Sequence, residues 1–193
     1  MALLAHWPKH RLPLDSASRA AALEAVKSAF APTIASLQVD LGLDELFEHI
    51  YVPLACWVLE NKPSDRPLVL GINGAQGAGK ALLFNILEVI LGEGFGQRIV
   101  SLRVDDLYLT RSERERLARE VHPLFKTRGV PGTHDVNLGL ELLEQLKTNQ
   151  ADQVVRIPVF DKSTDERCPV ESWQEWVGPV DIIVFDGWCM GAK

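Results

Sequence analysis

The sequence has little cysteine, no long hydrophobic run and no excess of positive charge, and each absence excludes a class of protein. Its three cysteines, Cys56, Cys168 and Cys189, are widely spaced and have no histidine cluster beside them. This number and spacing argue against both a disulfide framework and a zinc site. No apolar run approaches the length that crosses a membrane, and the N-terminus lacks the continuous apolar core of a signal peptide. We therefore expect a cytoplasmic protein with reduced thiols and no membrane partner.

The net charge of the chain further limits the classes of partner that it is expected to bind. The net charge is −6, whereas proteins that grip nucleic acid need a concentrated basic surface to displace counterions. We expect no nucleic-acid partner, although a small anionic ligand in a local pocket is compatible with this charge. With 193 residues, of which 47% are hydrophobic, the chain can bury one good core and carry a small accessory lobe.

A glycine-rich stretch, residues 71–83, follows an apolar run and precedes an amphipathic helix. Gly74, Gly77 and Gly79 let the backbone curl with its N–H groups pointing inward, and the helix N-terminus adds positive partial charge. Lys80 supplies a mobile cation for the outer phosphates. This arrangement predicts a phosphate-binding loop. Its expected nucleotide contacts are Gly74, Ala75, Gln76, Gly77, Ala78, Gly79, Lys80, Ala81 and Leu82.

One position of this loop departs from the expected pattern. Gly74 to Lys80 fits G-x-x-x-x-G-K, which normally continues with Ser or Thr, but this chain has Ala81. The missing hydroxyl is the group that reaches the magnesium ion in such loops. We therefore expect nucleotide binding to survive better than catalysis.

The residues before the loop have a helical pattern. Apolar residues recur at helical spacing between Asp15 and Asn61, with Pro53 as a kink or restart. We expect a helical cap at residues 1–66, packed on a nucleotide-binding domain at residues 67–193.

Two apolar strands are expected to end in carboxylates. The strand Arg98–Val104 is followed by Asp105 and Asp106. The strand Val180–Phe185 is followed by Asp186, which we expect to hold magnesium directly or through water. In an open parallel sheet, ligands sit at the C-terminal edge of the strands. Because adjacent acids on a strand point to opposite sides, only one of Asp105 and Asp106 can easily face the phosphates.

A polar loop lies between two predicted helices, Thr110–Glu120 and Asn137–Lys147. It is rich in glycine and proline and carries Arg128, His134 and Asp135. Binding residues concentrate on such loops. Farther along, we expect a strand at Val154–Phe160, a second polar loop with Lys162, and a packing segment at Pro169–Val177.

These pieces together resemble the D-glycerate 3-kinase family, within the phosphate-loop metabolite kinases that include uridine kinase and bacterial pantothenate kinase. The most specific piece is Arg128–Asp135, which reads R-G-V-P-G-T-H-D. The other matching pieces are Gly74–Lys80, Val104–Thr110, Asp161–Ser163 and Val180–Trp188. The resemblance covers residues 67 to 188. It implies an α/β fold, a three-layer phosphate-loop NTPase domain with a parallel sheet.

The resemblance also implies a reaction, the transfer of the γ-phosphoryl group of ATP to a hydroxyl of a small acid such as D-glycerate, with Mg²⁺. Lys80 and the loop amides would cradle the phosphates, and Asp105 or Asp106 would accept the hydroxyl proton. The implied metal ligands are Asp105 and Asp186. The residues expected to bind substrate are Arg128, His134, Asp135 and Lys162. Of these, Arg128, His134 and Lys162 would meet the substrate carboxylate or the migrating phosphoryl group, whose charge needs cationic neighbours.

Besides Ala81, the chain departs from the family pattern in two ways. Asp186 stands where the family usually has Glu, which shortens the reach to the metal by one methylene. The family continues past Trp188 with a lid and further strands, so we expect the domain to be incomplete at its C-terminus. The strand at 67–72 would then have the strand at 181–186 on one side and an unpaired edge on the other, open to self-association.

Alternatives to a D-glycerate-like kinase stay open. One is a kinase for another metabolite, such as a nucleoside or pantothenate. Another is a non-catalytic ATP-binding or regulatory protein, which Ala81 and the short C-terminus favour. The third is a truncated or engineered version of an active kinase.

Overall fold

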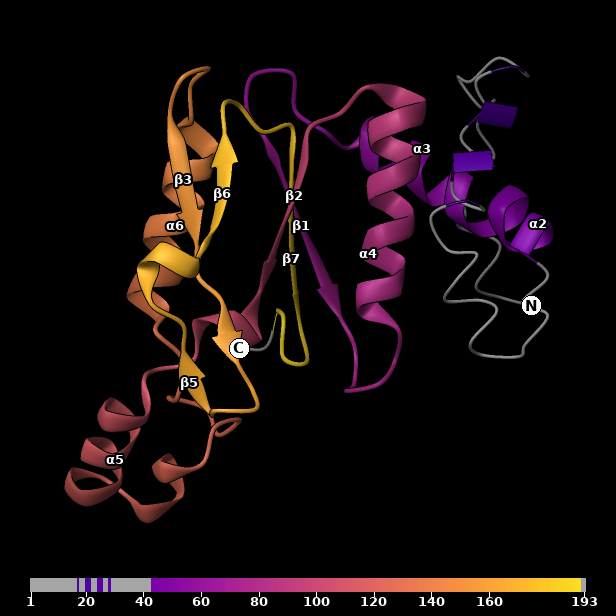
Figure 1. Cartoon of the computed structure of the whole chain (residues 1–193). Coiled ribbons are helices and arrows are strands. Elements are labelled where there is room, and N and C mark those ends of the chain that lie inside the picture. The colour runs from indigo at the N-terminus through magenta and orange to yellow at the C-terminus, as the bar shows by residue number, and fades with distance from the viewer. Residues whose placement is uncertain (1–16, 18–19, 22–23, 26–27, 29–42, 192–193) are drawn as a thin grey trace.

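The computed structural model describes residue 17, residues 20–21, 24–25 and 28, and the continuous stretch 43–191 (Figure 1). The helices expected between Asp15 and residue 42 therefore lie largely outside the described residues. Within these ranges, no helix has both the length and the apolar character needed to cross a membrane.

A parallel sheet forms the centre of the described structure. Its strands are β1 (Leu68–Asn73), β2 (Ile99–Arg103) and β7 (Ile182–Gly187), in the spatial order β1-β7-β2. Asp186 of β7 pairs in register with Ile72 of β1 and with Arg103 of β2. The carboxyl ends of the strands therefore meet at one edge, where the phosphate loop and Asp105 follow.

The first strand lies at the side of this sheet. Among the described residues β1 pairs with β7 alone, which confirms the neighbour expected for the strand at 67–72. Alternate side chains of β1 pack into the core: Leu68, Leu70 and Ile72. On the opposite face Val69 is 40% exposed. Within the part of the chain that the structure describes, this strand thus has one unpaired edge and one apolar side chain exposed to solvent.

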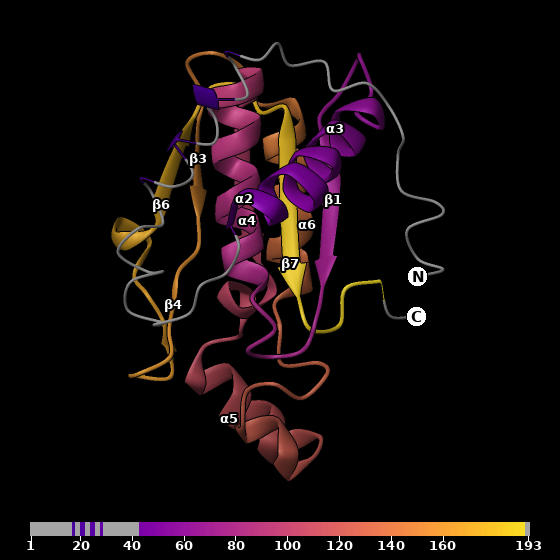
Figure 2. The same cartoon turned by 90° about the vertical axis from the view of Figure 1, so that its right-hand side faces the viewer.

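Helices cover the two faces of the sheet, which gives three layers (Figures 1 and 2). On one face α3 (Val52–Glu60) and α4 (Lys80–Val89) share a core with β7, whose Ile182 and Val184 are fully buried. On the other face α6 (Val136–Thr148) packs on Ile183 and Leu102. The described part of the expected helical cap therefore shares a core with the phosphate-loop helix.

Two helices contain π-helical turns that the sequence pattern did not predict. α2 (Leu43–Leu46) continues through the turn η2 (Phe47–Tyr51) into α3, so the chain stays helical up to and past Pro53. Pro53 is thus an interior residue of a continuous helix and has no N–H to donate to the preceding turn, and the irregular turn η2 lies directly before α3, where the proline interrupts regular α-helical bonding. α4 continues through η3 (Ile90–Gly94), so the helix that follows the phosphate loop extends to Gly94.

Two small antiparallel pairs lie beside α6. The predicted strand at 154–160 is divided into β3 (Val154–Ile157) and β4 (Phe160–Asp161), with Pro158 between them. Proline cannot donate to a strand ladder, which explains the break. The segment predicted only to pack contains a strand, β6 (Gln174–Val177), which pairs with β3. β4 pairs with β5 (Glu166–Arg167), and the short helix η6 (Val170–Ser172) connects β5 to β6.

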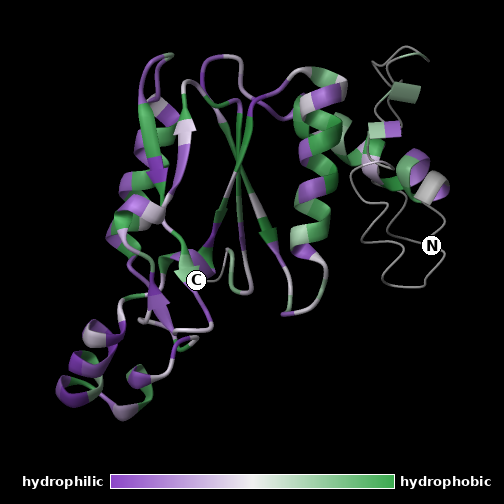
Figure 3. Cartoon of the chain, in the orientation of Figure 1, coloured by the Kyte–Doolittle hydropathy of each residue, from purple (hydrophilic) through white to green (hydrophobic). Residues whose placement is uncertain are grey.

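The helix α5 (Arg111–Glu120) and the turn η5 (Pro123–Lys126) project beyond the C-terminal edge of the sheet (Figure 1). α5 is predominantly hydrophilic, in contrast to the apolar strands (Figure 3). Thr110 begins it with a capping box, in which Thr110 and Glu113 satisfy each other's backbone N–H groups. This confirms the charged helix expected at 110–120.

The turn after β2 packs closely against α6. This turn is the short helix η4 (Val104–Leu107), which carries Asp105 and Asp106. A Cβ added to Gly139 of α6 would lie 2.9 Å from Cδ1 of Leu107. Asp135 caps the start of α6 by accepting the backbone N–H of Leu138 at 3.1 Å. The back of the acid-bearing turn therefore rests directly on the helix backbone.

Candidate functional site

A cleft of about 670 Å³ opens at the C-terminal edge of the sheet. Its walls come from the phosphate loop, the ends of β2 and β7, the loop before α6 and the turn between β4 and β5. The predicted site residues on these walls are Gln76, Gly77, Ala78, Gly79, Lys80, Ala81, Asp105, Arg128, Lys162 and Asp186. The fold thus gathers in one place residues that lie far apart in the sequence.

The phosphate loop has the conformation that its glycines allow. Gly77 and Gly79 have φ angles of 76° and 81°, in the left-handed region that side chains rarely adopt. Lys80 begins α4, and its Nζ donates hydrogen bonds to the carbonyls of Gly74 at 2.7 Å and Ala75 at 3.0 Å. The unpaired N–H groups of a helix start attract anions. The loop therefore places a cation and a helix N-terminus at the same wall of the cleft.

Three residues predicted for nucleotide contacts are not on the cleft wall: Gly74, Ala75 and Leu82. The first two accept hydrogen bonds from Lys80, as described above. A Cβ on Gly74 would lie 3.4 Å from Cγ of Lys80, so the lysine stem runs close along the loop. The half-buried side chain of Leu82 packs against the core shared by α3 and α4.

The two adjacent acids after β2 have different surroundings. Asp106 is buried, and its carboxylate accepts hydrogen bonds from Nε of Arg103 at 2.8 Å and from the backbone N–H of Phe160 at 3.0 Å. Asp105 lies on the cleft wall, where Nζ of Lys162 donates to its Oδ2 at 2.6 Å. The geometry gives Asp106 a structural role that ties β2 to β4. Of the two acids, it favours Asp105 for contact with a ligand.

Asp186 ends β7 as a buried carboxylate, only 8% exposed. Its Oδ1 has no hydrogen-bond partner within the described structure. Burial raises the pKa of this carboxyl, and the charges of Arg103 and Lys80 oppose that effect. Because an ionised carboxylate is costly to bury without partners, the site is suited to a cation.

The carboxylates at the cleft fit a magnesium ion that arrives with a nucleotide. Mg²⁺ usually takes one or two protein carboxylates and completes its octahedron with phosphate oxygens and water. Asp186 and Asp105 line the same cleft as the phosphate loop. The described residues contain no cluster of three or more side chains able to hold a metal without such help. Ala81, on the same wall, contributes no oxygen.

Two cations face the phosphate loop from the far wall. Lys162 lies in the β4–β5 turn and forms the ion pair with Asp105. Arg128 lies in the glycine-rich loop before α6 and forms an ion pair with Asp165. Because cationic groups stabilise both a carboxylate and a phosphoryl group in transfer, this wall can hold an anionic ligand opposite the loop.

The other two residues predicted to bind substrate do not line the cleft. His134 stacks on Tyr108, with ring centroids 4.3 Å apart, and its Nε2 is buried without a partner in the described structure. Burial lowers the pKa of His134, although the charge of Asp105 opposes this. Asp135 caps α6 and forms an ion pair with Arg167 at 3.2 Å. Both residues therefore support the wall from behind.

Tyr108 and Arg103 line the cleft but were not predicted as site residues. Burial, followed by the charge and hydrogen bonding of Asp105, raises the pKa of Tyr108 to about 12. Its hydroxyl can therefore orient the Asp105 carboxylate. The signal that could have found it is a tyrosine that closely follows two acids at a strand end. Arg103 ends β2, and its ion pair with Asp106 holds it beside Asp186.

No family model matches the chain. The chain is 32% identical to the chloroplastic D-glycerate 3-kinase of Arabidopsis thaliana over 163 residues, which cover 75% of this chain and 35% of that protein. It is 35% identical to an uncharacterized kinase of Schizosaccharomyces pombe over 138 residues, 67% of this chain and 49% of that one. The solved structure of D-glycerate 3-kinase from Cryptococcus neoformans superposes with a TM-score of 0.60 at 32% identity, covering 73% of this chain and 50% of that one. Over about two thirds to three quarters of its length, the chain is therefore similar to phosphate-loop kinases.

The similarity to the solved kinase structure confirms the expected α/β phosphate-loop fold, with helices on both faces of a parallel sheet. The chain spans about a third to a half of the length of these curated kinases. Within that span lie the phosphate loop, both strand-end carboxylates and the cationic wall of the cleft. The part of the kinase fold that this chain spans therefore includes the phosphate loop and the residues that line the cleft beside it.

Proposed function

We propose that this protein transfers the γ-phosphoryl group of ATP to a hydroxyl of a small organic acid, with D-glycerate as the first acceptor to test. The observation that carries the proposal is the composition of one cleft, which combines the loop lysine Lys80 with the carboxylate of Asp105 and the cations Arg128 and Lys162. The names of the kinases that the chain resembles support the same reaction class.

Each wall of the cleft has a proposed task. Lys80 and the N–H groups of the loop bind the β- and γ-phosphates, and Lys80 neutralises charge as the phosphoryl group moves. Asp105 accepts the proton of the acceptor hydroxyl, and the hydroxyl of Tyr108 orients its carboxylate. Arg128 and Lys162 bind the carboxylate of the acceptor or the migrating phosphoryl group, which fixes the hydroxyl for in-line attack.

Magnesium fits this proposal as the partner of ATP. Asp186 and Asp105 would hold it, and the ion would neutralise phosphate charge during transfer. Asp186 is suited to this because its Oδ1 has no other partner in the described structure. The chain itself leaves one gap, since Ala81 cannot provide the hydroxyl that such loops normally direct to the ion.

A second candidate is a non-catalytic ATP-binding role, which Ala81 specifically favours. Both candidates predict binding of ATP through the loop, but only the kinase predicts transfer to an acceptor. The variant Ala81→Ser separates the two candidates, because it adds a hydroxyl that can reach the metal at the start of α4. It leaves Arg128 and Lys162, the residues proposed to bind the acceptor, unchanged.

The test is a phosphoryl-transfer assay with ATP, Mg²⁺ and D-glycerate on the unchanged chain and on Ala81→Ser. We expect a measurable rate that rises about 10-fold or more in the variant, since one interaction made only in the transition state contributes about 1.4 kcal/mol or more. The control variant Ala78→Ser adds the same hydroxyl earlier in the phosphate loop and should give no gain in the rate of transfer. Uridine and pantothenate serve as acceptor controls.

The outcomes of this assay distinguish the kinase from the non-catalytic ATP-binding protein. Transfer to D-glycerate supports the proposal. Transfer to uridine or pantothenate instead would support a kinase that acts on a different acceptor. ATP binding by calorimetry without transfer in either chain, even with Asp105 intact, would favour the non-catalytic role.

A further inference from the structure

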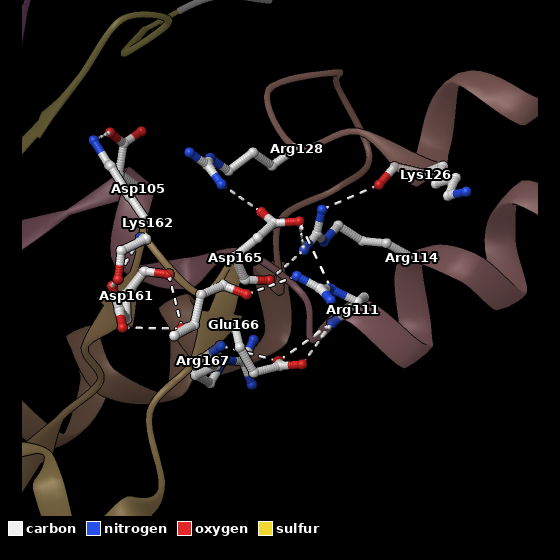
Figure 4. A network of polar contacts seen from close by, with 12 residues as sticks. Asp105, Arg111, Arg114, Lys126, Arg128, Asp161, Lys162, Asp165, Glu166 and Arg167 are labelled. Atoms are coloured by element: carbon white, nitrogen blue, oxygen red, sulfur yellow. Dashed lines mark hydrogen bonds and ion pairs between the residues drawn. The ribbon is translucent and has the colours of Figure 1, made fainter.

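Asp165 lies in the β4–β5 turn, among arginines from two other segments (Figure 4). It is the one non-glycine residue of the described chain with a positive φ, 56°. Aspartate tolerates this left-handed region better than most residues, but still at a modest cost. The turn therefore holds the Asp165 side chain in a defined direction, although its left-handed backbone slightly lowers the stability of the fold.

The carboxylate of Asp165 bridges two guanidinium groups. Its Oδ2 lies 3.0 Å from Nη2 of Arg114, and its Oδ1 accepts a hydrogen bond from Nη1 of Arg128 at 2.5 Å. Nε of Arg111 is 4.0 Å from Oδ2. Partial burial raises the pKa of Asp165, but hydrogen bonds from Arg128 and Arg114 outweigh this and hold it below its ordinary value. The bridge therefore contains an ionised carboxylate at neutral pH.

One of these arginines is a fixed anchor. Arg114 of α5 is fully buried, and it donates hydrogen bonds to the backbone carbonyls of Leu109, Lys126 and Asp165. Its guanidinium also lies over the ring of Phe160. A buried charge that is matched on every side holds its partners firmly, since moving any of them leaves it unpaired. Asp165 is thus fixed through both its backbone and its side chain.

The other arginine belongs to the cleft. Arg128 lines the cleft opposite the phosphate loop, and within the described structure its one ion-pair partner is Asp165. Its guanidinium lies 5.8 Å from the ring centroid of Phe160. Arginine has five N–H donors, and Asp165 takes only one through Oδ1. The remaining donors are available to an anion in the cleft.

We infer that Asp165 is a positioning residue, which acts through Arg128 by holding its guanidinium at the cleft wall in line with the incoming anion. The identity of that anion rests on the proposed function, whereas the contact between Asp165 and Arg128 does not. Arg114 and Arg128 carry two positive charges against the single negative charge of Asp165, so the cluster remains attractive to a carboxylate or a phosphate.

The first test measures the order of Arg128 directly and needs no catalysis. The probe is ¹⁵N relaxation of the Nε–H group of Arg128, assigned by its disappearance in Arg128→Lys. We expect a restrained side chain in the unchanged protein and a clearly more mobile one in Asp165→Asn, which keeps the shape and suits the left-handed backbone. Glu166→Gln removes the charge of the adjacent residue, the first of β5, and should leave Arg128 restrained, because Glu166 accepts hydrogen bonds from the backbone N–H of Arg111 instead. Unchanged mobility in Asp165→Asn would overturn the inference.

The second test is a double-mutant cycle in the phosphoryl-transfer assay with D-glycerate. We expect Asp165→Asn to lower kcat/KM by about 10- to 100-fold, as a small misplacement of a binding group does. In an Arg128→Gln background the same change should cost about 2-fold or less, since Asp165 acts through Arg128. An equal loss in both backgrounds would show a general effect on the fold and would contradict the inference.

Two further safeguards keep the tests decisive. If Asp165→Asn does not fold, Asp165→Gly replaces it, because glycine adopts the positive φ without strain and also removes the carboxylate. If the unchanged chain transfers no phosphoryl group, the proposed function fails, and the relaxation measurement alone then decides the role of Asp165.

Discussion

The buried carboxylate of Asp186 is suited to bind a cation, but its charge lowers the free energy of unfolding when no cation is bound. The variant Asp186→Asn measures this loss of stability. The side chain is 8% exposed, and its Oδ1 has no hydrogen-bond partner in the described structure. Burial raises its pKa, so the folded state binds a proton at this group more tightly than the unfolded chain does. The free energy of unfolding therefore falls as the pH rises from the ordinary value of 3.8 through the raised one.

The amide keeps the shape of the side chain and removes the charge. A buried ionised carboxylate costs more free energy than a neutral amide of the same shape, and Arg103 and Lys80 offset part of that cost here, so we expect a gain of about 1 kcal/mol. For a chain of this size that gain raises Tm by about 2–4 °C. The gain should be present at about pH 7 and should vanish near pH 3, where Asp186 is protonated in both states.

The assay is thermal unfolding in EDTA over this pH range, followed by the same measurement with ATP and Mg²⁺. Added Mg²⁺ and ATP should stabilise the unchanged chain more than Asp186→Asn, because the variant lacks a metal-binding oxygen. Asp152→Asn, on an exposed residue, is the matched control and should show neither effect. A lower Tm for Asp186→Asn in EDTA at neutral pH would refute the reasoning, since it would mean that the carboxylate has a stabilising partner.

Two other predictions concern the sheet. In Gly187→Ala the new Cβ would lie 2.7 Å from Cγ1 of Val104, a stiff β-branched neighbour, so we expect the free energy of unfolding to fall by about 1–3 kcal/mol in urea titrations. No loss would mean that Val104 moves aside freely. We also propose that the open edge of β1 allows self-association. Val69→Lys, at a side chain already 40% exposed, should shift the protein towards monomer in light scattering with little change in Tm, whereas an unchanged mass distribution would show that another surface associates.

The sequence predicted the features that depend on local patterns. The phosphate loop follows from glycine spacing between a strand and a helix, and Asp105 and Asp186 follow from strands that end in acids. The parallel sheet then brings these ends together, as the register of β7 with β1 and β2 shows. The capped helices α5 and α6 were equally visible, because charge and leucine periodicity mark them.

The features that were missed depend on contacts distant in sequence. No local pattern shows that the backbone N–H of Phe160 donates a hydrogen bond to Oδ1 of Asp106, which holds that acid away from the cleft. The bridge from Asp165 to Arg114 and Arg128 likewise joins separate segments, and its polar turn looks like ordinary surface. His134 seemed available on a polar loop, but the fold stacks it beneath Tyr108. The sequence therefore indicated which residue types form the site more reliably than which of them face the ligand.

The close approach of Gly139 to Leu107 links the geometry of the cleft wall to a position that does not line the cleft. Asp105 lies in the same turn as Leu107, and Tyr108 follows it directly, so a side chain added at 139 would press on the Leu107 side chain beside these two cleft residues. In evolutionary terms, a single inherited change at Gly139 would alter the support of the cleft wall while every residue that lines the cleft stays the same. Two descendants of this protein with identical cleft residues would then differ in the shape of the cleft.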